Sequence, residues 1–547
     1  MSIVGYVARQ FSPTRVTLYW MNQIDAFFRS SHSRPMQTTD LAPASTQQVT
    51  LPPPEKPSDL RGSSSFFRKH VAIILLISIC VLIPCFWLPK IEAGDLPSHT
   101  YNAWLASLVQ KGQAPGLWLV PQHNNILADI LLSRLGTLFG FAAAEKIVAA
   151  LAVLLFFWGA IALATVSSGK PPWFLVPLIA MLAYGWTFHM GFLNFYFSLG
   201  ISFVALAILW QPNRRLYPVV LLLAPLIWLA HPLGFVWFAA TAFYILAANS
   251  LPNRLHPLLF LAGLVAMLLV HLYFSSSYDV RWWQGHFYDL NGSDQLILGT
   301  RYPFIAYSVL GTVAAFGLFH LLQSLRKPSP DTNYFPPALQ LFLIGLLALP
   351  FLPEKIFLSP YPDPVSFICS RFTLAIAILG CCALARLCPH FVFAAVLACI
   401  AAVFFVLVYQ DASRTYAMEK QADVLVAKLP QDARVITTIF PFRDSRIFTH
   451  HVMDRACIEH CFNIGNYEAS SKQFRLRASP NNRFVETAPL NAAHMMIGDY
   501  VVQNEDLPLW QIFQCGPAET DLCLRPIHVG PLTNFISSEA VRARPLR

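Results

Sequence analysis

Residues 70–104 read HVAIILLISICVLIPCFWLPKIEAGDLPSHTYNAW. Positions 71–89 form an uncharged apolar run, long enough for a helix that crosses a membrane. The polar sequence that follows directly contains Asp95 and His99. Because the apolar run ends where these residues begin, the sequence predicts that Asp95 lies at the boundary between membrane and water.

The rest of the chain has the composition of a polytopic membrane protein. Of its 547 residues, 55% are hydrophobic and only 12% are charged, and the mean hydropathy is +0.50. Soluble globular chains are about a quarter charged. The composition excludes an ordinary cytosolic enzyme, a disordered protein and the usual kind of nucleic-acid binder, so no nucleic-acid partner is expected.

Charge divides the chain into three zones. Residues 70–409 contain only 25 charged residues, whereas residues 410–547 contain 30, with 15 of each sign. We therefore predict a transmembrane domain at 70–409 and a C-terminal domain of soluble composition at 410–547. Residues 1–69 have no secretory signal and are rich in Ser, Thr, Gln and Pro, which predicts a disordered N-terminal tail.

Eleven apolar stretches predict a mainly α-helical membrane bundle. They lie at 71–89, 147–166, 173–188, 195–210, 217–230, 233–248, 256–274, 304–325, 338–352, 371–386 and 389–409. Every second loop between them is basic, with Lys170, Arg214, Arg215, Arg254, Arg326, Lys327 and Arg386. Since basic loops stay in the cytoplasm, the pattern predicts a cytoplasmic N-terminus and an extracytoplasmic, periplasmic C-terminal domain. Such a chain would be a multi-pass protein of the bacterial inner membrane.

The C-terminal domain is predicted to be a small α/β domain. A helical pattern at 412–429 is followed by strand-like runs at 434–439 and 500–502. Its cysteines are Cys457, Cys461, Cys515 and Cys523. An even number in an exported domain predicts two disulfides, with three pairings open. The alternative is a metal site, because several histidines lie close by: His450, His451 and His460.

The first outside loop, 90–146, carries the residues with the clearest chemistry. It has two amphipathic helical patterns and is long for a connector, so it can wall a site at the membrane surface. Asp95 and His99 are four residues apart and share one face if this segment is helical. The alternative role for Asp95 is structural, as the N-cap of a helix with Pro97 in its first turn.

Further polar residues collect at the predicted outer ends of the other spans. They include His189, Asn194, His231, Arg281 and Arg371. Each alone is expected to cap a turn or to anchor a helix at the interface, whereas together they predict a basic, histidine-rich rim opposite Asp95. The centres of the spans contain almost no ionisable residues, which disfavours an ion-coupled transporter.

These residues resemble the GT-C superfamily of integral-membrane glycosyltransferases. Four short segments carry the resemblance, which covers most of 70–409: GDLPSH at 94–99, NNILAD at 124–129, GFLNF at 191–195 and CSRF at 369–372. Members of that superfamily have a long first outside loop with an acidic residue near its start that is required for catalysis, and Asp95 matches that position. Many members have two adjacent acidic residues there, whereas this chain has Gly94 before Asp95, with Glu92 two positions before Gly94.

The resemblance implies sugar transfer from a polyprenyl-phosphate-linked donor to a glycan, lipid or protein acceptor on the outer face. Asp95 is then expected to be the catalytic base of an inverting displacement. The expected substrate-binding residues are Arg371, which would hold the phosphate, and His99, His189, Asn194, His231 and Arg281.

No cofactor is required by this interpretation. Some members of the superfamily use a divalent cation such as Mg²⁺ or Mn²⁺, for which the loop offers Asp95, Glu92 and His99. Two functions outside this family stay open. A transporter or flippase for lipid-linked glycans, without transferase activity, also explains a basic outer rim. A non-catalytic membrane scaffold would use the exported domain and would tolerate Asp95→Ala.

Overall fold

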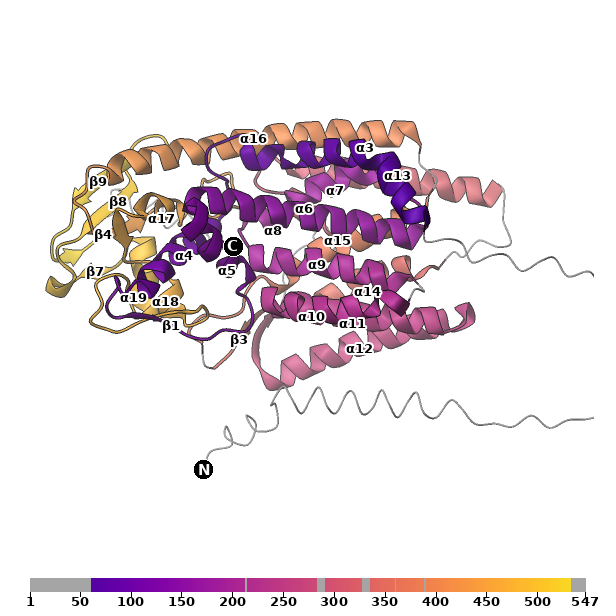
Figure 1. The fold of residues 1–547 in the computed structure, drawn as a ribbon, viewed down its shortest axis with the longest axis horizontal. Coiled ribbons are helices and arrows are strands. Elements are labelled where there is room, and N and C mark those ends of the chain that lie inside the picture. The colour runs from indigo at the N-terminus through magenta and orange to yellow at the C-terminus, as the bar shows by residue number, and fades with distance from the viewer. Residues whose placement is uncertain are drawn as a thin grey trace, which may run out of the picture. The chain divides into compact units, whose positions relative to one another are not determined.

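The computed structural model describes residues 61–211, 214–282, 291–326, 335–359, 361–387 and 390–532. In these ranges the chain is mainly helical, with a few small sheets (Figure 1). The predicted disordered tail lies outside the described residues up to position 60. Residues 61–69 begin the first helix, α3 (Arg61–Phe86), so this helix starts earlier than the predicted apolar run.

All eleven predicted apolar stretches are helical over most of their described residues. Six of the helical segments are long and apolar enough to cross a membrane: Phe141–Ser168 (α6), Leu193–Trp210 (α9), Pro232–Ser250 (α11), Asn253–Ser277 (ending in α12, His256–Ser277), Pro303–Arg326 (α13) and Phe391–Val426 (α16). Five are shorter: His70–Phe86 in α3, Trp173–His189 (with α7, Val176–Ala183, and α8, Trp186–His189), Tyr217–Ala230 (α10), Pro337–Phe351 (with α14, Pro337–Ala348) and Ile368–Leu384 (α15). These helices are those of an integral membrane protein.

Proline sets where many of these helices begin. A proline occupies the first or second position of α7, α10, α11, α12 and α14. Proline is tolerated there because its missing N–H would have no partner inside the helix. The sequence therefore starts each of these helices at a defined residue after a short loop.

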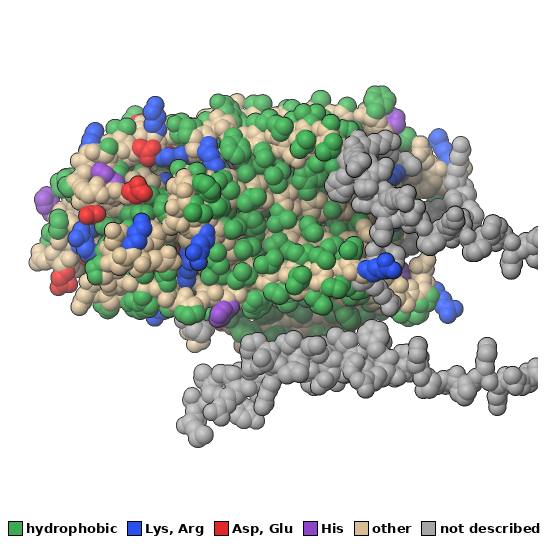
Figure 2. Space-filling model, in the orientation of Figure 1, with side chains coloured by type: hydrophobic (Ala, Val, Ile, Leu, Met, Phe, Trp, Pro, Cys, Tyr) green, Lys and Arg blue, Asp and Glu red, His purple; other side chains and the backbone are tan. Residues whose placement is uncertain are grey.

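The outer surface of the helices is apolar. Leu221, Leu222 and Phe243 on α10 and α11 are more than 70% exposed, and His256 is the one buried residue among those described in α12. Figure 2 shows hydrophobic side chains covering the helical part of the face drawn, whereas acidic side chains gather at the end formed by the C-terminal region. An exposed apolar surface of this extent suits contact with lipid and not with water.

Helices α6 and α9 form the buried centre of the bundle. Their approach is close because Gly159 faces Gly200, and a Cβ added to Gly159 would lie 2.8 Å from the Gly200 carbonyl oxygen. Small residues allow this approach in membrane bundles, where packing replaces the hydrophobic effect.

Helix α16 crosses the predicted domain boundary at 409/410 without a break. Residues 391–426 contain neither glycine nor proline, so nothing in the sequence ends the helix there. The predicted span at 389–409 and the helical pattern at 412–429 are therefore parts of one helix. By its contacts the chain from His70 onward forms one compact unit, and the separate C-terminal domain stays a prediction.

The C-terminal region combines a four-stranded sheet with short helices. The strand order is β5 (Cys461–Asn463), β4 (Ala433–Thr438), β8 (Trp510–Gln514) and β9 (Leu522–Pro526), and β4 is parallel to both of its neighbours. The helices are α17 (Val452–Cys457), α18 (Glu468–Ser471) and α19 (Pro489–Ile497). The predicted strand at 434–439 corresponds to β4. The run at 500–502 contains β7 (Val501–Val502), which pairs with β10 (Gly530–Pro531).

The four predicted disulfide cysteines are paired. Cys457 is bonded to Cys461, and Cys515 to Cys523. This selects one of the three pairings, and it removes both cysteines from the predicted alternative metal site with His450, His451 and His460.

The segment 90–146, predicted to be the first outside loop, is fixed to the C-terminal region by backbone pairing and by a buried arginine. Strand β1 (Leu117–Leu119) pairs antiparallel with β6 (Leu476–Ala478). The Arg455 guanidinium on α17 donates to Glu145 Oε2 at 2.8 Å, to a carboxylate oxygen of Glu419 and to the Ile91 carbonyl at 2.6 Å. All three charged side chains are less than 8% exposed, so one cation holds two buried carboxylates together.

Replacing Arg455 with leucine should destabilise the protein by about 3–5 kcal/mol, because two buried carboxylates lose their partner. Thermal unfolding of the purified protein in detergent measures the change. Arg443→Leu is the matched control, since Arg443 is 74% exposed and lies 3.6 Å from Glu519 at the surface. An equal effect of the two substitutions would contradict the role of Arg455.

Candidate functional site

Backbone hydrogen bonds place Asp95 at the start of α4 (Leu96–Gln110). The Gly94 N–H donates to the His189 carbonyl at 2.7 Å, and the Asp95 N–H donates to the Met190 carbonyl at 3.0 Å. The turn after α8 can approach this closely because of Gly191, which has φ of 81°. A Cβ at Gly191 would lie 2.5 Å from the Asp95 nitrogen. The two segments, far apart in sequence, thereby fix one another.

The Asp95 carboxylate does not cap the helix that it precedes. Asp95 is the N-cap residue of α4, yet its side chain accepts no capping hydrogen bond. The side chain is 19% exposed, and its Oδ1 lies 4.0 Å from His451 Nε2. The alternative prediction, that Asp95 caps the helix, is therefore wrong. Its carboxylate is not engaged in capping.

His451 on the C-terminal side faces Asp95. Its Nδ1 lies 3.2 Å from Asp454 Oδ2, and Asp454 in turn accepts a hydrogen bond from Asn463. Burial alone would lower the pKa of His451, but the bond to Asp454 and the charge of Asp95 raise it above its ordinary value. The His451 imidazole beside Asp95 therefore holds its proton more tightly than an ordinary histidine does.

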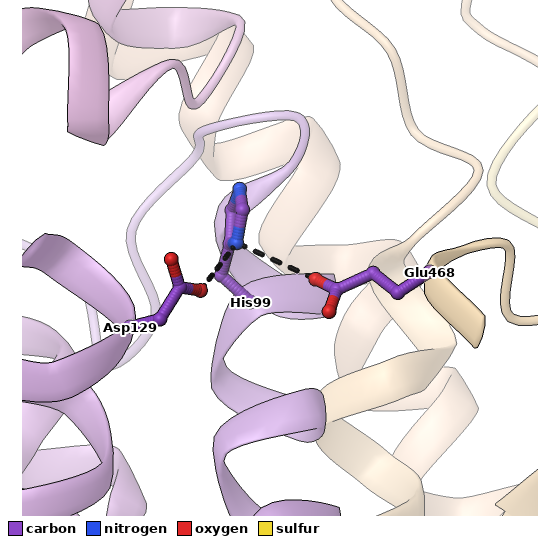
Figure 3. A group of neighbouring side chains, drawn as sticks. All are labelled: His99, Asp129 and Glu468. Atoms are coloured by element: carbon purple, nitrogen blue, oxygen red, sulfur yellow. Dashed lines mark hydrogen bonds and ion pairs between the residues drawn. The ribbon is translucent and has the colours of Figure 1, made fainter. Parts of the chain in front are cut away.

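A second cluster lies on the next turn of α4 (Figure 3). His99 Nδ1 is 2.9 Å from Asp129 Oδ1, on α5 (Leu127–Phe139), and 3.4 Å from Glu468 Oε1, on α18. The three residues are each at most 7% exposed. Asn194 fixes the second Asp129 oxygen with a hydrogen bond of 2.8 Å, and its own Oδ1 accepts the Ala128 N–H at 2.7 Å. Asn194 thus positions the start of α5.

The charges of this cluster are strongly coupled. Burial opposes protonation of His99, but the Asp129, Glu468 and Asp95 carboxylates raise its pKa to about 10. Burial also works against ionisation of Asp129, yet His99 and Asn194 keep the pKa of Asp129 below its usual value. For Glu468 burial dominates and raises the pKa to about 8, although His99 opposes that rise. At neutral pH the charge is therefore concentrated on His99 and Asp129.

Arg371 brings a cation to the same neighbourhood from the first turn of α15. Its guanidinium carbon lies 4.0 Å from the centre of the Phe192 ring, and its Nη1 lies 3.3 Å from His231 Nε2. Its Nε is buried and has no hydrogen-bond partner among the described residues. The carboxylates of Asp95 and Glu354 act on it electrostatically. Arg371 therefore has donor capacity that none of the described residues uses.

Two predicted substrate-binding residues have other surroundings. His189 Nδ1 bonds to the Glu92 carbonyl at 3.0 Å, and the His189 carbonyl accepts the Gly94 N–H, so this histidine supports the loop that carries Asp95. Arg281 is exposed on β2 (Asp279–Trp282), opposite Lys355 on β3 (Pro353–Phe357). Within the described part of the chain no hydrogen bond or ion pair joins Arg281 to Asp95.

The remaining members of the cluster were not predicted as site residues. Asp129 lies at the end of the NNILAD segment, which was one of the four that carried the resemblance. Asp454 and Glu468 had no signal in the sequence. Glu468 acts on His99, which lies 369 positions earlier, and Asp454 acts on its near neighbour His451, which itself reaches Asp95 only through the fold. The trio named for a divalent cation, Asp95, Glu92 and His99, is also not gathered. In the described chain the atoms with ligand spacing, all within 4.8 Å of one another, belong to His99, Asp129 and Glu468.

Comparisons with protein-family models, with curated proteins and with solved structures find no match to this chain. The functional argument therefore rests on the residues and their chemistry.

Removing the Asp95 side chain should cost little stability. We expect Asp95→Ala to change the free energy of unfolding by no more than about 0.5 kcal/mol, because no capping bond is lost. Asp129→Ala should cost about 3 kcal/mol or more, since buried His99 and Asn194 lose their acceptor. Thermal unfolding of both variants decides the matter. If the two losses are equal, Asp95 is a structural residue.

Glu92 should make stability depend on pH. Burial raises the pKa of Glu92 to about 8, partly opposed by the hydrogen bond from Thr415, and Asp411 and Glu419 add to the rise. Because the folded protein holds this proton more tightly than the unfolded chain, the associated stability is complete at about pH 4.5 and is lost as the pH rises through about 8.

Glu92→Gln cannot ionise and keeps an oxygen to accept the Thr415 hydroxyl. We therefore compare the difference in unfolding temperature, variant minus wild type, at the two pH values. It should be larger at pH 8 than at pH 5 by roughly 2–4 °C. Unfolding curves of both proteins at the two pH values test this. Parallel pH dependence of the two proteins would show that Glu92 does not titrate as stated.

Proposed function

We propose that this chain is a multi-pass membrane glycosyltransferase of the GT-C type, which moves a sugar from a polyprenyl-phosphate-linked donor to an acceptor on the outer face. The observation that carries the proposal is the Asp95 carboxylate, which is not used for capping at the N-terminus of α4, nine residues after the apolar helix α3 ends. It is partly exposed, and His451 and Arg371 act with it electrostatically. Helix capping does not account for a carboxylate at this position.

In this proposal all eleven helical segments cross the membrane, with the N-terminus in the cytoplasm and the C-terminal region outside. Two disulfides in the C-terminal region support an oxidising compartment. The end of the bundle opposite that region carries lysine and arginine side chains on the face drawn in Figure 2, as the positive-inside rule requires.

Asp95 would act as the general base. As the acceptor hydroxyl attacks the anomeric carbon, its proton passes to the Asp95 carboxylate, and the bond from that carbon to the phosphate oxygen breaks. The attack comes from the side opposite the leaving phosphate, so the anomeric configuration inverts. His451, fixed by Asp454, would hold the carboxylate in place.

Arg371 would bind the leaving group. Breaking the glycosidic bond places negative charge on the polyprenyl phosphate, which sits at headgroup depth. The unpartnered Nε–H of Arg371 lies at the end of an apolar helix, where such a phosphate would be. A buried, prearranged guanidinium stabilises developing charge strongly, because it needs no reorganisation during the reaction.

The test compares cell-envelope glycolipids and polysaccharides by mass spectrometry in strains of the source organism. The strains are a deletion and the same deletion restored with wild type, Asp95→Asn or Asp423→Asn at matched protein level. Asp423 is the control carboxylate, because it pairs with Lys90 on the exposed surface. We expect one sugar to be missing in the deletion and in the Asp95→Asn strain, and present in the other two.

A normal glycan profile with Asp95→Asn would contradict the proposal. Loss of the sugar only when the C-terminal region is changed would favour a scaffold. A glycan that is made but retained on the inner face would favour a transporter or flippase of lipid-linked glycans.

A further inference from the structure

We propose that His99, Asp129 and Glu468 together bind one transition-metal dication of the Zn²⁺ or Mn²⁺ class, which joins the C-terminal region to the first outside loop. The three ligands come from α4, α5 and α18, and their sequence positions span most of the chain (Figure 3). The proposed cation does not touch Asp95, and the inference does not rest on the proposed glycosyltransferase activity.

The spacing of the ligand atoms suits such an ion. His99 Nδ1 is 2.9 Å from Asp129 Oδ1 and 3.4 Å from Glu468 Oε1, and all three atoms lie within 4.8 Å of one another. An ion with metal–ligand distances of about 2.1 Å holds neighbouring ligands roughly 3.0–3.4 Å apart. One imidazole and two carboxylates favour a transition metal over Ca²⁺, which prefers oxygen ligands alone.

Hydrogen bonds alone leave this cluster incomplete. His99 Nδ1 carries at most one proton, and the shorter distance directs it to Asp129. Glu468 Oε1 is buried and has no hydrogen-bond partner among the described residues. Arg475, the nearest further cation, gives its bonds to the Asp129 carbonyl and to Ser133. A buried carboxylate oxygen without a donor is costly, and a cation between the three groups supplies what it lacks.

The surroundings provide the remaining parts of a metal site. Asn194 orients the Asp129 carboxylate through its other oxygen, as outer residues do in metal centres. A cavity of about 10 Å³ borders Asp129 and Glu468 and is also lined by Gln122 and Asn125. That is about the space of one water molecule, which could fill a fourth coordination position.

We expect the bound cation to strengthen the attachment of the C-terminal region to the segment 90–146. Glu468 lies just after β5, and β6 follows it and pairs with β1. A cation shared by His99, Asp129 and Glu468 would reinforce this attachment and stabilise the folded protein by mass action.

The experiment uses the purified full-length protein in detergent, stripped with EDTA and then dialysed against Zn²⁺ or Mn²⁺. Bound metal is measured by elemental analysis, and the unfolding temperature is recorded with and without metal. Wild type should bind one equivalent and unfold several degrees higher with metal. Glu468→Gln, which keeps the shape but replaces a carboxyl oxygen with an amide nitrogen that cannot bind a metal ion, should bind at least tenfold more weakly and show no such rise.

His494→Asn is the matched control. It removes a histidine–carboxylate pair with Asp499, but this pair is about half exposed and has no third ligand. The control should bind metal as the wild type does. If Glu468→Gln does not fold, X-ray absorption of the Zn²⁺-loaded wild type provides the test, and we expect nitrogen and oxygen neighbours at about 2.0–2.1 Å without sulfur.

Folded wild type that takes up no metal would overturn the inference, as would equal binding by Glu468→Gln or a zinc site with sulfur neighbours. These outcomes are independent of the glycan profile, which tests only the proposed activity through Asp95. The two proposals can therefore fail separately.

Discussion

The pairing of the first outside loop with the turn after α8 is the constraint on which the site depends. Two backbone hydrogen bonds, from Gly94 to His189 and from Asp95 to Met190, fix the chain where it leaves the first apolar helix. Gly191 allows that contact, since any side chain there would strike the Asp95 backbone. With its backbone held in this way, Asp95 does not need its carboxylate for capping.

Residues of the C-terminal region form the other side of the candidate site. His451 faces Asp95, Glu468 faces His99, and Arg455 joins two buried carboxylates to the loop backbone. All three are charged or ionisable groups buried at the polar end of an apolar bundle. Because unpaired charges are costly there, the contacts specify how the C-terminal region lies against the loop.

The sequence alone predicts much of the helical architecture. All eleven apolar stretches are helical over most of their described residues, and the position of Asp95 directly after the first of them followed from the end of the apolar run. The unbroken helix α16 was not predicted. The composition changes at 409/410, which suggested a domain boundary, but no residue there breaks a helix. The eleven membrane crossings and their orientation stay predictions.

The candidate site was predictable only in part, for a physical reason. Asp95, His99 and Asn194 lie in segments with recognisable local patterns. The partners His451 and Glu468 reach Asp95 and His99 through long-range packing, which leaves no periodic trace in one sequence, and Asp454 acts through His451. His189 lies beside Asp95 as predicted, but its ring bonds to the Glu92 carbonyl and its own carbonyl accepts the Gly94 N–H. Arg281 is exposed on β2.

The most direct measurement of the central claim is turnover by the purified protein in liposomes. The liposomes would contain polyprenyl-phosphate-linked sugars and envelope lipids as acceptors, and release of free polyprenyl phosphate would be followed by mass spectrometry. We predict release with wild type and none with Asp95→Asn, although both proteins fold alike. Release at equal rates by both proteins would contradict the account, as would transport of intact donor across the bilayer without release.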